Sequence, residues 1–200
     1  MESGELGVRA KKICRDLIFF QLINIRIIVF LLIGTLLLFG TLRFQGKDLI
    51  KPYASKGIVS LEMASSVITT KHLLWEWKND GLIRTVRNNI LIDFLFIPFY
   101  VLLFYTLCGS ISVRLHSIPA NLGVLLAFFS LIAGIFDVFE NILMLSAYVG
   151  LYNFITTTLT AIFATLKFIL LGLSILYVIV FGSQVIWMKL ARARISELAD

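Results

Sequence analysis

The stretch IAGIFDVFENILML (Ile132–Leu145) places two carboxylic acids and an amide inside a long apolar segment. Asp137, Glu140 and Asn141 recur at the spacing i, i+3 and i+4, which puts three side chains on one face of an α-helix. Charged groups inside a bilayer cost several kcal/mol each, on the order of +2.5 to +3.5 at a helix centre, unless they face protein or water. The stretch therefore predicts a membrane helix that turns a polar stripe toward neighbouring helices.

The composition extends this prediction to the whole chain. Of its 200 residues, 59% are hydrophobic and 15% are charged, whereas about a quarter of the residues of a soluble domain are charged. A helix that crosses a bilayer needs roughly 20 mostly apolar residues, and four segments qualify, at about 19–42, 90–110, 122–148 and 158–182. We predict an all-α integral membrane four-helix bundle that forms a single domain over residues 1–200.

The first loop contains an expected amphipathic helix at about residues 59–79, which we predict to lie at the membrane interface or to pack across the mouth of the bundle. One expected face is apolar and the other polar. The apolar face consists of Met63, Ala64, Val67, Ile68, Leu74, Trp75 and Trp77, and the polar face of Glu62, Ser65, Ser66, Thr69 and Glu76. Gly81 is the expected stop signal, and the fourth helix is expected to continue past Trp187 into a basic tail.

The orientation in the membrane is not decided by the loop charges. Lysine and arginine are equally frequent on the two sides of the four predicted spans, so the positive-inside rule gives a tie. The dense basic flank before the first span (Arg9, Lys11, Lys12, Arg15) favours cytoplasmic termini. We expect a multi-pass protein of the cell membrane, the inner membrane if the host is a bacterium.

Five charged residues fall within the predicted spans: Arg26, Asp93, Asp137, Glu140 and Lys167. At about 1.5 Å of rise per residue, Lys167, Asp137 and Glu140 lie at similar depths of roughly 14–18 Å from the first-loop side. We therefore predict that Lys167 pairs with Asp137 or Glu140.

Other polar residues are expected to complete or flank this set. Asn141 and the hydroxyl of Tyr100 would satisfy the remaining hydrogen bonds. Arg26 is expected to reach the surface on the termini side and Asp93 the surface on the first-loop side. This network is compatible with a structural core, which we favour, and with a proton relay.

Familiar catalytic and metal-binding patterns are missing from the sequence. It has no histidine–glutamate helical pair, glycine-rich phosphate loop or serine elbow, so we assign no catalytic residues, no metal ligands and no cofactor. Asp93 and Asp137, which differ by roughly 12 Å in predicted depth, are not expected to share a proton. The expected partners are the lipid bilayer, a protein partner and further copies of the chain, and direct nucleic-acid binding is left open.

Two resemblances accompany these residues. Three segments resemble parts of bacterial four-span proteins without an assigned activity: DFLFIPFYVLLFY, GIFDVFEN and LKF. These segments carry Asp93, Pro98, Tyr100, Asp137, Glu140, Asn141 and Lys167. In size, span number and basic N-terminus, the chain also resembles the small accessory membrane proteins of RNA-targeting type VI-B CRISPR systems. The ribonuclease motif of one accessory class, Arg followed by four residues and His, is absent: Val67 and Ile111 stand five residues before His72 and His116.

The second resemblance implies the accessory class that damps the interference of the RNA-guided effector. We therefore expect a non-catalytic accessory or regulatory protein of antiviral defence. Two alternatives remain open: a proton- or ion-conducting oligomer that uses Asp137, Glu140 and Lys167, and an intramembrane lipid-modifying enzyme.

Overall fold

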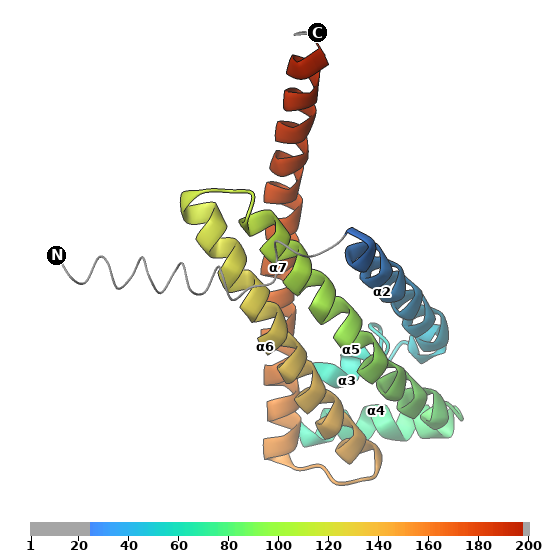
Figure 1. Cartoon of the computed structure of the whole chain (residues 1–200). Coiled ribbons are helices and arrows are strands. Elements are labelled where there is room, and N and C mark those ends of the chain that lie inside the picture. The colour runs from blue at the N-terminus through green and yellow to red at the C-terminus, as the bar shows by residue number, and fades with distance from the viewer. Residues whose placement is uncertain (1–24, 198–200) are drawn as a thin grey trace, which may run out of the picture.

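The computed structural model describes residues 25–197, and this part of the chain is all-α (Figure 1). The four long helices are α2 (Ile25–Gly46), α5 (Ile83–Ser112), α6 (Ser117–Tyr148) and α7 (Phe154–Glu197). Between α2 and α5 lie a turn of 3₁₀-helix, η2 (Lys47–Leu49), and two shorter helices, α3 (Val59–Glu62) and α4 (Val67–Asn79).

The four-span prediction is confirmed. The segments Ile25–Leu49, Ile83–Ser112, Ser117–Tyr148 and Phe154–Met188 are long and apolar enough to cross a bilayer, so the protein is a multi-pass membrane protein. Residues 19–24 of the first predicted span lie outside the described residues. The second helix begins at Ile83 and not near residue 90, because Arg84, Arg87, Asn88 and Asn89 form the first turns of α5 despite their polarity.

Helix α5 stands at the centre of the bundle and packs against α2, α6 and α7. It approaches α6 closely at Gly134, where an added Cβ would lie 2.5 Å from Val101 Cγ2. Small residues allow such approaches between membrane helices, where dispersion contacts replace the hydrophobic effect. In the half of the bundle nearer the α5–α6 turn, the core is closed by Cys108, Leu126, Ala127 and Tyr177.

The amphipathic helix predicted at about 59–79 is two helices, and its predicted faces are partly wrong. Residues 63–66 interrupt it, and the Ser66 side chain caps α4 by accepting a hydrogen bond from the Thr69 amide. Leu74 and Trp77 are buried as predicted, whereas Ile68 is 83% exposed and Trp75 is 56% exposed. The predicted stop at Gly81 is confirmed by its positive φ of 73° directly after α4.

Helix α4 crosses the end of the bundle behind the lower ends of α5 and α6 in Figure 1. The Trp77 indole is fully buried there and donates a hydrogen bond to the Leu49 carbonyl over 3.2 Å. This contact fastens α4 to the segment that follows α2. At the opposite end, α7 projects well beyond the other helices, as the sequence predicts for the tail after Trp187.

Candidate functional site: a charged cavity within the bundle

Lys167 of α7 forms the centre of a buried ionic cluster. Its ammonium lies 2.6 Å from Asp137 Oδ1 and 2.8 Å from Glu140 Oε2, both carried by α6. The exposed fractions of these side chains are 8% for Lys167, 5% for Asp137 and 0% for Glu140. The predicted pairing is therefore present with both acids, because the i, i+3 spacing turns the two carboxylates of α6 toward the same point on α7.

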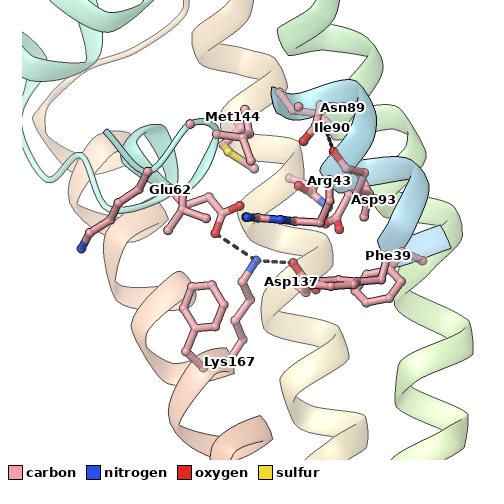
Figure 2. A pocket seen from close by; sticks show the side chains of 18 of the residues that line it. Phe39, Arg43, Glu62, Asn89, Ile90, Asp93, Asp137, Met144 and Lys167 are labelled. Carbon is pink, nitrogen blue, oxygen red and sulfur yellow. Dashed lines mark hydrogen bonds and ion pairs between the residues drawn. The ribbon is translucent and has the colours of Figure 1, made fainter. Parts of the chain in front are cut away.

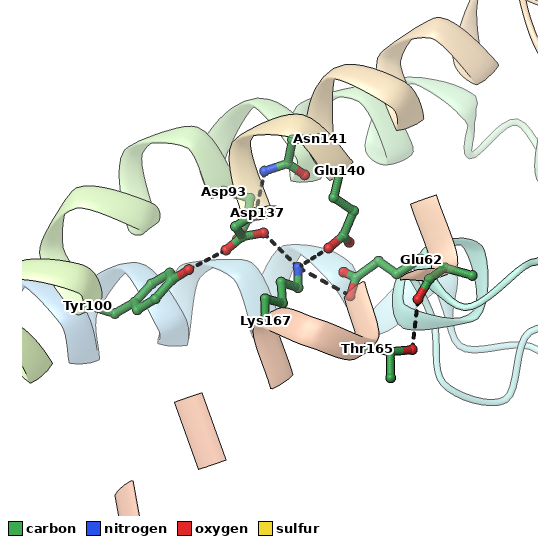
Figure 3. Close-up of polar contacts among 9 residues, drawn as sticks. Glu62, Asp93, Tyr100, Asp137, Glu140, Asn141, Thr165 and Lys167 are labelled. Atoms are coloured by element: carbon green, nitrogen blue, oxygen red, sulfur yellow. Dashed lines mark hydrogen bonds and ion pairs between the residues drawn. The ribbon is translucent and has the colours of Figure 1, made fainter. Parts of the chain in front are cut away.

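Helix α5 contributes two further polar side chains to the cluster (Figure 3). The Tyr100 hydroxyl donates to Asp137 Oδ2 over 2.7 Å, which leaves Asp137 with a hydrogen bond on each oxygen. The Asn141 side-chain amide donates to Asp93 Oδ2 over 2.6 Å. Tyr100 and Asn141 thus belong to the predicted polar network. The hydrogen bond of Asn141, however, goes to Asp93 and not to the pair formed by Lys167 and its acids.

The position predicted for Asp93 is wrong. Instead of reaching the membrane surface, its half-buried carboxylate faces the cluster and lines the same cavity as Asp137. The depth was underestimated because α5 starts at Ile83, so Asp93 lies ten residues, or about 15 Å of helical rise, from the start of the helix. Arg26 lies near the other end of α2 from the cavity with its side chain exposed.

Glu62 is the member of the site that sequence reasoning missed. It was assigned to the polar face of a surface helix, but it lies at the end of α3 with only 10% of its side chain exposed and Oε2 at 3.6 Å from the Lys167 ammonium. Burial raises the pKa of this carboxyl above its usual range, and Lys167 opposes the rise. Ser66, a helix-cap residue four positions later, was the available sign that the helix breaks after Glu62.

The cluster forms one wall of an open cavity of about 190 Å³ (Figure 2). The other walls combine apolar side chains from two spans with basic residues at the first-loop end. The apolar residues include Phe39 and Leu42 of α2 and Phe168 and Leu171 of α7, and the basic ones are Arg43 and Lys56. The cavity is therefore both charged and apolar.

A polar clamp holds α2 in place as one side of this cavity. The Asn89 side chain of α5 donates to the Leu42 carbonyl over 3.2 Å and to Gln45 Oε1 over 3.1 Å. Further along the same pair of helices, an added Cβ at Gly34 would overlap the Phe99 ring. The close contact in the middle of α2 and the clamp near its C-terminal end hold this helix against α5, since Leu31 is the one buried residue that α2 itself contributes.

The cluster carries more acid than base and leaves several acceptors unused. Asn141 Oδ1 and Glu140 Oε1 are buried and have no hydrogen-bond partner, and Glu62 Oε2 faces the Lys167 ammonium at 3.6 Å without a hydrogen bond. Such groups are costly unless a donor or a proton reaches them. Within residues 25–197, no group of three or more His, Cys, Asp or Glu side chains is arranged to hold a metal ion. The arrangement is suited to binding a molecule that is apolar at one end and donates hydrogen bonds at the other.

No protein-family model, curated protein or solved structure matches this chain.

Proposed function

We propose that this protein is a non-catalytic accessory protein of the membrane that binds one amphipathic lipid molecule in the cavity between α2, α5 and α7. The observation that carries the proposal is the composition of the cavity wall, where buried carboxylates, a lysine and an amide adjoin phenylalanines and leucines of two spans. Ligand sites are typically apolar clefts with a few fixed polar groups that orient the ligand.

The rim of the cavity supports a lipid over a water-soluble molecule. Phe39 is 51% exposed and Phe168 is 42% exposed, and both belong to spans that face the acyl chains. The mouth between α2 and α7 is thus lined by side chains at the protein–lipid boundary. A lipid could insert its polar head sideways toward Lys167 and leave its chains against these rings.

Native mass spectrometry of the detergent-purified protein tests this proposal. We expect one lipid to remain bound to the wild type and to be lost from Leu171→Trp, whose indole would fill the cavity. Leu176→Trp on the same helix is the matched control, since Leu176 is 58% exposed and does not line the cavity. Equal lipid occupancy in the two variants would contradict the proposal.

A conducting role receives less support from the geometry. Among the described residues, the charged cluster lies in the half of the bundle next to the first loop, and the other half is closed by Cys108, Leu126 and Tyr177. Proton flux into liposomes that was abolished by Lys167→Met in a folded protein would favour conduction over lipid binding. Turnover of a labelled lipid that depended on Asp137 would instead favour the enzyme alternative.

The role in RNA-guided antiviral defence stays a prediction from the resemblance in size and span number. Co-expression with a type VI-B effector checks it: RNA interference is expected to fall when this protein is present. Unchanged interference would remove the CRISPR role without affecting the lipid-binding proposal.

A further inference from the structure

The charges of the buried cluster are unequal in number. Four carboxylates (Glu62, Asp93, Asp137 and Glu140) surround the cluster, and Lys167 is the cation within ion-pair distance of three of them. Three of the four carboxylates also line the cavity itself. An excess of buried negative charge requires protons or an additional cation. A ligand with a positive head would supply that cation where the cavity meets the cluster.

The hydrogen-bond acceptors of the cavity wall indicate which kind of cation the site favours. Asn141 is completely buried and lines the cavity. Its Nδ2 donates a hydrogen bond to Asp93, and its Oδ1 has no hydrogen-bond partner. Glu62 also lines the cavity, and its Oε2 lies 3.6 Å from the Lys167 ammonium without a hydrogen bond. Both atoms are acceptors. A primary ammonium carries three N–H donors and no acceptor, whereas a quaternary ammonium has no N–H donor to offer them.

The first-loop end of the cavity carries the opposite charge. Arg43 and Lys56 line the cavity and are exposed, and in Figure 2 the Arg43 side chain extends across the cavity in the direction of Glu62. Guanidinium and ammonium groups are the side chains that bind phosphate. The wall is therefore acidic in its interior and basic at its first-loop end.

We infer that the cavity selects a lipid whose head group joins a phosphate to a primary amine, with the ammonium among Glu62, Asp93, Asp137 and Asn141 and the phosphate near Arg43 and Lys56. This inference rests on the proposed lipid-binding function and adds the chemistry of the head group. The acyl chains would leave the cavity between Phe39 and Phe168.

The test compares lipids that differ only in the head group. Delipidated protein is mixed with equimolar dioleoyl phosphatidylethanolamine, phosphatidylcholine and phosphatidylglycerol, and bound lipid is counted by native mass spectrometry. We expect the primary amine to be preferred to the quaternary amine by about tenfold, which corresponds to about 1.4 kcal/mol. Equal binding of the two amines would overturn the head-group inference but leave lipid binding intact, and binding of none would overturn both.

Substitutions in the cavity wall test which residues produce the preference for the primary amine. Asp93→Asn removes a carboxylate from the cavity wall and is expected to reduce the preference for the primary amine to about threefold or less. Asp80→Asn, an exposed carboxylate that accepts a hydrogen bond from Tyr53, is the matched control and should keep the full preference. An undiminished preference in a folded Asp93→Asn protein would assign the selectivity to another site. Because the wild-type comparison needs no substitution, the inference stays falsifiable if the variant fails to fold.

A competition experiment with a soluble head group distinguishes a lipid ligand from a water-soluble amine ligand. Glycerophosphoethanolamine has the same phosphate and ammonium without acyl chains, and we expect it to displace bound lipid only at a concentration well above that of the lipid. Displacement at equal concentrations would show that the apolar rim contributes nothing and would assign the cavity to a water-soluble ligand.

Discussion

Lys167 is the residue on which the buried cluster depends, because it supplies the charge that faces Asp137 and Glu140 at 2.6 and 2.8 Å. Removal of one partner from a buried ion pair typically costs about 3–5 kcal/mol, since the other charge is left uncompensated. We predict that Lys167→Met lowers the unfolding temperature of the detergent-solubilised protein markedly, as followed by circular dichroism.

The control for this change is Lys78→Met, which removes an exposed lysine at the end of α4. Exposed substitutions usually change stability by no more than about 0.5 kcal/mol. If the two lysine variants unfolded at the same temperature, Lys167 would not be stabilising its carboxylate neighbours.

Glu62 is expected to make stability depend on pH. Its pKa is raised in the folded protein by burial, so above its ordinary pKa the folded state binds more protons than the unfolded state. Stability from this group is complete below the ordinary pKa of about 4.3 and is lost as the pH rises through the folded-state value. We predict that the unfolding temperature of wild type falls across this range and that Glu62→Gln flattens the fall. Glu76→Gln is the control, and identical pH profiles for wild type and Glu62→Gln would contradict the prediction.

Part of the cluster could be predicted residue by residue, and part could not. Asp137, Glu140 and Lys167 were accessible because helical periodicity and depth apply within continuous apolar spans. Glu62 was not, since its burial depends on how a loop folds back over the bundle, which no periodicity within the loop encodes. The predicted depth of Asp93 was wrong because the start of α5 was predicted too late. The first turns of α5 are polar, and the apolar pattern that marks a span does not include them.

At the scale of elements, the pairing of α5 with α6 depends on the small residue Gly134. A Cβ there would lie 2.5 Å from Val101 Cγ2, closer than real contacts allow, so the Val101 side chain or the helices themselves would have to shift. We predict that Gly134→Val destabilises the bundle by about 1–3 kcal/mol, the usual cost of overpacking, as measured by reversible unfolding in detergent.

Gly172→Val provides the matched control within α7, because nothing lies within 4 Å of a Cβ added at that position. We expect little change in stability there. A Gly134→Val protein as stable as Gly172→Val would show that α5 and α6 do not meet closely at Gly134.

The loop between α2 and α5 is the element whose role differs most from its sequence pattern. Its continuous amphipathic period predicted one helix, at the membrane interface or across the mouth of the bundle, whereas the Ser66 cap starts a separate helix and frees residues 63–66 to turn. The turn directs Glu62 inward while α4 covers the end of the bundle. The Ser66 cap interrupts the helix that the amphipathic periodicity predicts, and as a result Glu62 reaches the site.

At the scale of the whole molecule, four spans place the first loop and the C-terminal tail on opposite sides of the membrane. We predict that a cysteine at Ser55 and a cysteine at Arg194 react with an impermeant thiol reagent from opposite faces of membrane vesicles, in a background without Cys14 and Cys108. Labelling of Arg194→Cys from the cytoplasmic face would agree with the predicted orientation. Labelling of both positions from the same face would contradict the four-span topology.

The overall architecture was predictable because lipid imposes length and apolarity on every span. The cavity was not, because it arises where α2 stands beside α5 and faces α7 across the cluster, an arrangement set by the Asn89 clamp and the contact of Gly34 with Phe99. These contacts join residues more than forty positions apart in the sequence.

Photocrosslinking in the native membrane tests the central claim, that a lipid occupies this cavity, most directly. Cells are supplied with a lipid that carries a diazirine on its acyl chain, the membrane is irradiated, and the modified peptides are mapped by mass spectrometry. We predict that crosslinks concentrate on Phe39, Leu42, Phe168 and Leu171, which line the cavity in α2 and α7. Crosslinks spread evenly over these residues and over lipid-facing residues away from the cavity, such as Leu176 and Ile179, would contradict it.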